Sequence, residues 1–140
     1  MIKVIFLCHG NICRSVMAEY IAKFLDKEHR FDFISRAVSR EEEGNDIYPP
    51  AKATLIKHHI PYAHHEAKRI SLDEFKEADV ILCMDNSNIS RLNMLFPYEN
   101  FSKVRLLQPM EIEDPWYTGD FETVYLQLES SIKRFLNEHK

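Results

Sequence analysis

Short apolar runs alternate along the chain with longer segments in which apolar residues recur every three or four positions. Runs of strand length at residues 4–7, 31–35, 80–84 and 104–107 predict four strands. The first and third runs are continuously apolar, which is typical of a sheet that is buried on both faces.

The segments between these runs predict helices. From Met17 the apolar positions 17, 20, 21, 24 and 25 follow helical spacing. Two prolines, Pro49 and Pro50, open the helix that is expected at residues 50–59. Residues 71–78 open with a capping-box pattern, in which Ser71 precedes Glu74 by three positions.

Two more helices are expected in the second half of the chain. Asn86 or Ser87 is expected to cap a helix that runs to Phe96, and Asp120 to cap the last helix. That helix is the clearest, because its apolar positions 121, 124, 125, 128, 132, 135 and 136 form one stripe. Strands that alternate with helices predict an α/β fold with a parallel sheet and right-handed crossovers.

Length and composition narrow the class of protein. The chain has 140 residues, and we expect residues 1–140 to form one domain. Hydrophobic residues at 45% and charged residues at 29% are typical of an ordinary globular protein. A net charge of −4 argues against a nucleic-acid partner, although a locally positive site is compatible with an anionic substrate.

Targeting signals are not evident in the sequence. The apolar runs are far too short to span a bilayer, so no membrane association is expected. The start M-I-K-V lacks the pattern of a secretory leader. The three cysteines, Cys8, Cys13 and Cys83, are too few for a secreted disulfide framework, and their odd number leaves at least one thiol free. We therefore expect a cytoplasmic protein.

The segment C-H-G-N-I-C-R-S, residues 8–15, lies between the first strand and the first helix. Backbone amides that lead into a helix N-terminus form a cradle for an oxyanion such as phosphate. Arg14 can offer two parallel donors to such an anion. The same amides, the helix dipole and the guanidinium should favour the thiolate of Cys8. A buried strand-end cysteine is the alternative for Cys8 alone, but the combined pattern favours an oxyanion site with a sulfur nucleophile.

The other residues of this loop fit the same site. Ser15 can donate its hydroxyl to the thiolate, Gly10 permits a close approach of the backbone, and Asn11 tolerates a left-handed conformation that braces the loop. Two alternatives remain open for Cys13. It packs under the loop, or it forms a reversible disulfide with an oxidised Cys8.

A cysteine that attacks phosphorus also needs a general acid for the leaving group. The segment E-I-E-D-P-W-Y, residues 111–117, follows the fourth strand and supplies carboxyl groups. Asp114 precedes Pro115, which holds it in an extended conformation from which its carboxyl can be aimed. From this segment alone, an ordinary turn aspartate is the simpler interpretation.

Taken together, these segments resemble the low-molecular-weight protein tyrosine phosphatase family. The matching motifs cover nearly the full length: C-H-G-N-I-C-R-S followed by M-A-E, S-R-A-V-S at residues 35–39, I-L-C-M-D-N-S-N at 81–88, E-D-P-W-Y at 113–117 and D-F-E-T-V-Y at 120–125. The resemblance implies a three-layer sandwich in which a four-stranded parallel sheet is flanked by helices. It also implies hydrolysis of phosphotyrosine without a metal or other cofactor.

The resemblance implies a role for each motif residue. Cys8 is the nucleophile, Arg14 and the loop amides bind phosphate, and Asp114 acts as general acid and then as base. Asn11, Ser15 and Ser39 support the loop. The implied substrate-binding residues are His9, Gly10, Asn11, Ile12, Cys13, Ser15, Glu41, Trp116 and Tyr117. The implied partners are phosphotyrosine-containing proteins or small aryl phosphates, and a monomer or weak dimer is expected.

The sequence departs from the family at the edge of the site. His9 replaces a usual hydrophobic residue, Val16 replaces a common proline, and Glu41 replaces an aromatic residue that forms one wall of the cleft. A carboxylate at residue 41 should disfavour acidic peptides near the phosphate. Trp116 and Tyr117 should retain the opposite wall, on which a phenyl ring can stack.

Three other functions are weighed against the phosphatase. An arsenate reductase of this fold needs later cysteines to carry a disulfide cascade, and Cys83 is the only later one. A phosphoprotein-binding module without catalysis is expected to lack the nucleophile or the acid. A metal site at His58-His59 or His64-His65 is disfavoured, because adjacent histidines point to different sides and chelate poorly; exposed histidines, or one satisfied buried histidine, are expected instead.

Overall fold

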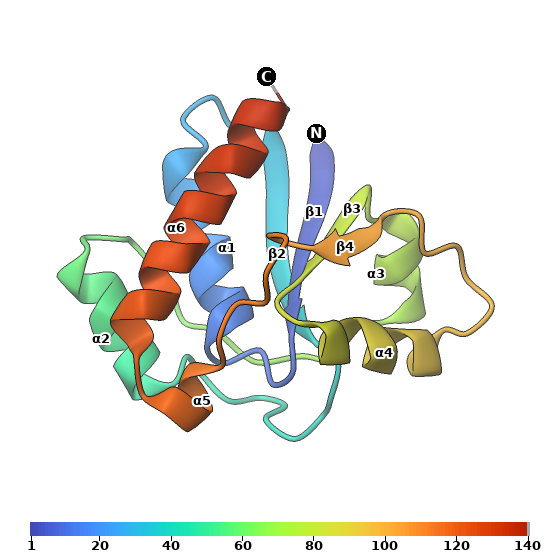
Figure 1. The fold of residues 1–140 in the computed structure, drawn as a ribbon, viewed down its shortest axis with the longest axis horizontal. Coiled ribbons are helices and arrows are strands. Elements are labelled where there is room, and N and C mark those ends of the chain that lie inside the picture. Colours follow the sequence, from blue (N-terminus) through green and yellow to red (C-terminus); the bar gives the residue numbers. More distant parts are fainter. Residues whose placement is uncertain (140) are drawn as a thin grey trace.

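Four parallel strands form the centre of the structure, a computed structural model that describes residues 1–139. The strands lie in the order β2-β1-β3-β4, so β1 is an inner strand (Figure 1). The predictions of four strands and of a parallel sheet are confirmed. The strands are β1 (Ile2–Cys8), β2 (Phe31–Ala37), β3 (Val80–Cys83) and β4 (Val104–Leu106).

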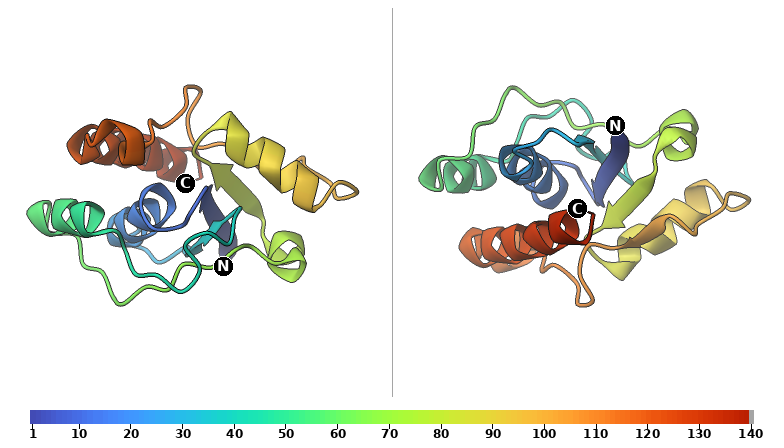
Figure 2. Two further views of the ribbon diagram at one scale, coloured as in Figure 1. Left: turned by 90° about the horizontal axis from the view of Figure 1, so that it is seen from below. Right: turned by 90° about the horizontal axis from the view of Figure 1, so that it is seen from above.

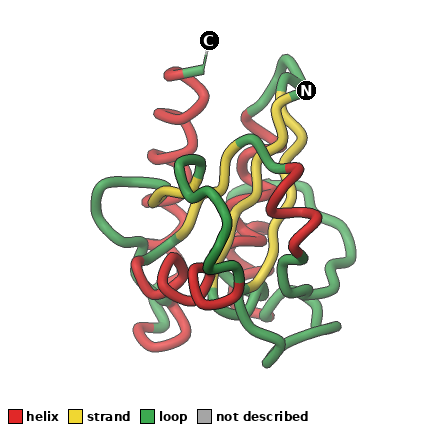
Figure 3. Tube along the Cα trace, turned by 90° about the vertical axis from the view of Figure 1, so that its right-hand side faces the viewer, coloured by secondary structure: helices red, strands yellow, loops and turns green. Residues whose placement is uncertain are grey.

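Helices cover both faces of this sheet and make the predicted three-layer α/β sandwich (Figure 2). Figure 3 shows the sheet from the side that α3 and α4 cover. The opposite face carries α1, α2 and α6, and the short α5 lies near the end at which the strands finish (Figure 1). The helices are α1 (Arg14–Leu25), α2 (Pro49–Lys57), α3 (Leu72–Glu77), α4 (Asn86–Leu95), α5 (Pro115–Thr118) and α6 (Phe121–Glu138).

The inner strand β1 supplies side chains to both layers. Val4 and Phe6 pack in the apolar cluster that contains α1 and α6. Ile5 and Leu7 pack in the second cluster, with α3 and α4. Residues 4–7 are therefore buried throughout, which explains why this strand reads as a continuous apolar run and not as an alternating one.

The capping predictions are confirmed at two helices and wrong at a third. Ser71 closes a capping box with Glu74, and Asp120 accepts a hydrogen bond from Thr123 N. The cap of α4, however, is Asp85, and not Asn86 or Ser87.

The physical reason for this cap lies in the backbone and in a reciprocal pair of bonds. Asp85 is extended, with φ −149° and ψ 170°, whereas Asn86 already begins the helix. The Asp85 carboxylate accepts from Asn88 N at 3.0 Å, and the Asn88 amide oxygen accepts from Asp85 N at 3.1 Å. Each residue thus satisfies a backbone donor of the other.

The segments that follow β1, β2, β3 and β4 meet at one edge of the sheet, as parallel strands require. Val38 N donates to Cys8 O at 3.1 Å, and Ile112 N donates to Met84 O at 2.8 Å. The first bond joins the residue after β2 to the end of β1, and the second joins the segment before α5 to the residue after β3. Within residues 1–139, the structure contains no helix with the length and apolarity of a membrane span.

Candidate active site

The loop between β1 and α1 folds around the sulfur of Cys8. Asn11 N and Ser15 N donate to Cys8 Sγ at 3.3 and 3.4 Å. Ser15 Oγ lies 3.0 Å from the same sulfur. Cys13 precedes α1 without capping it through its side chain, and one of the first amides of the helix, Ser15 N, points at the sulfur instead. Donors on three sides of one sulfur are an arrangement that stabilises negative charge on it.

Asn11 holds this loop in shape. Its φ of 62° is left-handed, as expected from the sequence, and its side chain is fully buried. Asn11 Nδ2 donates to Ser15 Oγ at 2.8 Å, which leaves the Ser15 hydroxyl proton free to point at the sulfur. Asn11 Oδ1 accepts from Lys68 N at 3.2 Å. Asn11 thus joins Ser15 to the backbone at Lys68, and these bonds support the loop.

Two further groups fix the loop from outside. Ser39 donates to His9 O through both its backbone N and its hydroxyl, at 3.2 and 3.0 Å. His65 is 8% exposed, and its Nε2 donates to Asn11 O at 2.6 Å. His65 is the buried, satisfied histidine that the sequence allowed. Its contact with the loop was not predicted, because 54 residues separate the two partners.

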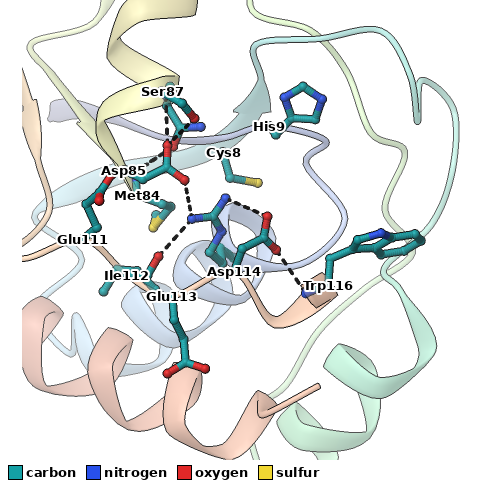
Figure 4. Close-up of polar contacts among 12 residues, drawn as sticks. Cys8, His9, Met84, Asp85, Ser87, Glu111, Ile112, Glu113, Asp114 and Trp116 are labelled. Atoms are coloured by element: carbon teal, nitrogen blue, oxygen red, sulfur yellow. Dashed lines mark hydrogen bonds and ion pairs between the residues drawn. The ribbon is translucent and has the colours of Figure 1, made fainter. Parts of the chain in front are cut away.

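Arg14 lies at the base of the site and is 2% exposed. Nη1 donates to Asp85 Oδ2 at 2.8 Å and to Ile112 O at 3.0 Å, and Nη2 lies 3.4 Å from Asp114 Oδ2 (Figure 4). Burial alone would lower the pKa of Arg14, but the charge of Cys8 and the hydrogen bond with Asp85 raise it. The guanidinium therefore stays charged and is held in one orientation.

Asp85 is a site residue that the sequence analysis missed. Burial would raise its pKa, but hydrogen bonds from Ser87 and Arg14 lower it, so Asp85 is a carboxylate at neutral pH. It cannot be recognised from local pattern, because it serves Arg14, which lies 71 residues away. The available signal was its position directly after the third strand, at the edge where the site forms.

Asp114 caps α5 and faces the sulfur from the side of Arg14 (Figure 4). Its φ of −91° and ψ of 108° are extended, as expected of a residue before proline. Asp114 Oδ1 accepts from Trp116 N at 3.0 Å, and its side chain is 30% exposed. The predicted loop at residues 111–117 is thus partly helical, since α5 begins at Pro115.

A pocket of about 550 Å³ opens above these groups. His9 Nε2 lies 3.0 Å from Glu41 Oε2 at its mouth. Trp116 packs against Tyr48 with ring centroids 5.0 Å apart, while Tyr117 is exposed. A side chain at Gly10 would place its Cβ 3.2 Å from Glu42 Cγ. The lining residues are Cys8, His9, Gly10, Ile12, Cys13, Arg14, Glu41, Glu42, Asp85, Ser87, Arg91, Asp114, Trp116 and Tyr117.

Comparison with known proteins agrees with this geometry. The sequence model of the low molecular weight phosphotyrosine protein phosphatases matches residues 3–140. The chain belongs to this family. A chicken (Gallus gallus) low molecular weight phosphotyrosine protein phosphatase is 36% identical, over 96% of this chain and 94% of the relative.

Solved structures give the same result. The low molecular weight protein tyrosine phosphatase of Streptococcus pyogenes superposes with a TM-score of 0.95 at 34% identity, over 99% of this chain and 93% of that one. A Drosophila arginine phosphatase superposes with a TM-score of 0.87 at 30% identity, over 99% and 98% of the two chains. The fold of this family member is therefore shared with phosphatases of two named specificities.

The two other cysteines differ from Cys8 in their surroundings. Cys13 lines the pocket, and burial together with the nearby Cys8 raises the pKa of its thiol. Cys83 is fully buried in the cluster on the other face of the sheet, and burial raises its pKa to about 12. Both thiols are free. Cys83 therefore packs in the core, and a Cys8–Cys13 disulfide stays a prediction.

Two of the four paired histidines, His58 and His65, form close hydrogen bonds with protein groups. His58 Nε2 contacts both carboxylate oxygens of Glu122 at 2.9 Å and stacks on Tyr125 with centroids 3.7 Å apart. His64 is largely exposed. In the part of the chain that the structure describes, residues 1–139, His, Cys, Asp and Glu side chains do not gather in threes as metal ligands would.

His65→Ala should destabilise this family member and slow it, because the substitution leaves the buried Asn11 carbonyl without its donor. We expect a loss of about 1–3 kcal/mol in the free energy of unfolding, the cost of an unsatisfied buried group. Urea unfolding and kcat for p-nitrophenyl phosphate would measure both effects. His64→Ala is the control, since an exposed change should stay within about 0.5 kcal/mol. Equal stability of the two variants would contradict the role of His65.

Proposed function

We propose that the chain hydrolyses phosphotyrosine and other aryl phosphomonoesters through a cysteinyl-phosphate intermediate. The observation that carries this proposal is the convergence of two amides and a hydroxyl on Cys8 Sγ, with the Arg14 guanidinium and the Asp114 carboxyl beside it. Together these groups supply a nucleophile, an anion cradle and a proton donor, which are the parts that the reaction requires.

In the first step the thiolate of Cys8 attacks phosphorus in line with the leaving phenol. The P–O bond breaks as the S–P bond forms, and Asp114 gives its proton to the departing oxygen. The loop amides and Arg14 bind the three equatorial oxygens, where charge is spread in the transition state. The amides come from a loop that Asn11, Ser39 and His65 already hold in shape, so little reorganisation is needed.

In the second step water attacks the cysteinyl phosphate. Asp114, now a carboxylate, accepts a proton from that water, and the S–P bond breaks to release inorganic phosphate. The sulfur leaves as a thiolate. Ser15 Oγ, 3.0 Å from the sulfur, stabilises this thiolate by donating a hydrogen bond to it.

The pocket favours an aromatic substrate. Ile12, Trp116 and Tyr117 line it, so a phenyl ring has apolar and aromatic surface to contact. An arsenate reductase is disfavoured, because Cys83 is buried in the cluster on the far side of the sheet and cannot relay a disulfide to Cys8. A silent binding module is disfavoured because the nucleophile and the acid face one pocket.

A substrate panel tests the proposal. The panel consists of peptides that are identical except for a phosphotyrosine, a phosphoserine or a phosphoarginine. The phosphotyrosine peptide should have the highest kcat/KM, by about 10-fold, which is near the upper worth of one aromatic contact. Phosphoarginine belongs in the panel because of the Drosophila structure. Vanadate should inhibit, and EDTA should not. Faster release of phosphate from phosphoarginine would overturn the tyrosine assignment, and inhibition by EDTA would overturn the metal-free mechanism.

A further inference from the structure

The charged side chains at the mouth of the pocket are separated by sign. Glu41 and Glu42, in the segment between β2 and α2, line one side. Arg91, on α4, lines another. Arg14 carries the remaining positive charge, but it lies at the base and is already bound by Asp85 and Ile112 O. A substrate that crosses the mouth thus meets opposite charges on different sides.

Arg91 is available to a ligand. It is exposed, and it makes neither a side-chain hydrogen bond nor an ion pair with any residue in the described range 1–139. The carboxylates of its own wall are otherwise engaged. Asp85 binds Arg14 and Ser87, and Glu111 accepts from Asn86 N at 2.7 Å. The guanidinium is therefore a free cation that borders the phosphate pocket.

The acidic side of the mouth contacts the loop between β1 and α1, which we call the phosphate loop (residues 8–15). Glu41 Oε2 contacts His9 Nε2 at 3.0 Å. Glu42 Oε2 accepts from Asn45 Nδ2 at 2.7 Å, and its Cγ packs against Gly10. Within residues 1–139, Glu42 pairs with no Lys or Arg side chain. No paired cation therefore offsets the carboxylate of Glu42 at the mouth of the pocket.

We infer that this rim selects phosphotyrosyl peptides that carry an acidic side chain on the flank facing Arg91 and a basic side chain on the flank facing Glu42. The inference rests on the proposed function, because the phosphate must be anchored at Cys8 for the flanks to be placed. An extended peptide advances about 3.3–3.6 Å per residue. Residues one or two positions from the phosphotyrosine therefore reach the charged walls of the mouth.

Steady-state kinetics on matched phosphopeptides tests the inference. Each peptide carries Asp or Asn, or Lys or Gln, at one position from −2 to +2 relative to the phosphotyrosine. At low ionic strength Asp should be preferred over Asn on one flank by about 2- to 5-fold in kcat/KM, the range of an exposed ion pair. Lys should be preferred over Gln by a similar factor on the other flank. Both ratios should fall at high salt.

Charge variants assign each preference to its residue. The Asp preference should vanish in Arg91→Gln and invert in Arg91→Glu, and the Lys preference should vanish in Glu42→Gln. Arg134→Gln is the matched control, because Arg134 is an exposed residue of α6 that does not line the pocket, and its substitution removes the same charge. Because each ratio is taken within one enzyme, a variant that is merely less active leaves it unchanged.

Two outcomes overturn the inference. Equal kcat/KM values for the Asp and Asn peptides, and for the Lys and Gln peptides, with the unaltered enzyme would show that the mouth of the pocket does not select by charge. An Asp preference that persists in Arg91→Gln would show that a residue other than Arg91 causes it. Failure of the proposed function is distinct from both, since no phosphotyrosyl peptide would then release phosphate at all.

Discussion

Cys8→Ser should lower kcat for p-nitrophenyl phosphate by about 10⁴-fold or more, the typical loss when a nucleophile is removed. A serine hydroxyl is far less acidic than a thiol, and the amides of Asn11 and Ser15 that face the sulfur cannot make it an alkoxide at neutral pH. The anion cradle itself stays intact. Inorganic phosphate or vanadate should therefore still bind, which calorimetry would measure.

The control for this variant is Cys83→Ala. It removes a thiol that packs on the other face of the sheet and does not line the pocket. Most of the activity should remain, with a modest loss of stability. Near-normal turnover by Cys8→Ser would contradict the mechanism, because Cys8 would then not be the nucleophile. Loss of phosphate binding would show that the substitution had disrupted the anion-binding loop.

Asp114→Asn should lower kcat by about 10²- to 10⁴-fold, the usual worth of a positioned general acid. The loss should be greater for phenyl phosphate than for p-nitrophenyl phosphate, because the poorer leaving group depends more on protonation. The alkaline limb of the pH–rate profile should flatten. Asparagine retains an oxygen that can accept from Trp116 N, so the start of α5 should persist.

Glu113→Gln is the matched control for Asp114. The neighbouring carboxylate points away from the pocket in Figure 4 and does not line it. Its removal should change kcat little. An alkaline limb that is the same in Asp114→Asn and in the unaltered enzyme would show that another group supplies the proton.

The sheet and the phosphate loop could be predicted because their determinants are local. A continuous apolar run at residues 4–7 requires a strand covered on both faces, and the structure covers it on both. The loop at residues 8–15 carries its sulfur, its amides and its arginine within one strand-to-helix connection. The extended backbone of Asp114 follows from the proline beside it.

The supporting residues could not be predicted because their partners are distant in the sequence. Asp85 and His65 act on residues 71 and 54 positions away, and no local pattern specifies such contacts. The misplaced cap of α4 has a different cause. Asp85, Asn86 and Ser87 are all good caps by residue type, and only the backbone of Asp85, together with its exchange with Asn88, decides among them.

Trapping of the phosphoenzyme tests the central claim most directly. Asp114→Ala enzyme mixed with p-nitrophenyl phosphate and quenched within milliseconds should carry phosphate on Cys8, because the substrate's good leaving group permits the first step while the loss of the base slows the second. Mass spectrometry of the digest would locate it. Phosphate on a histidine or serine, or no phosphoenzyme while p-nitrophenol is being released, would contradict the account.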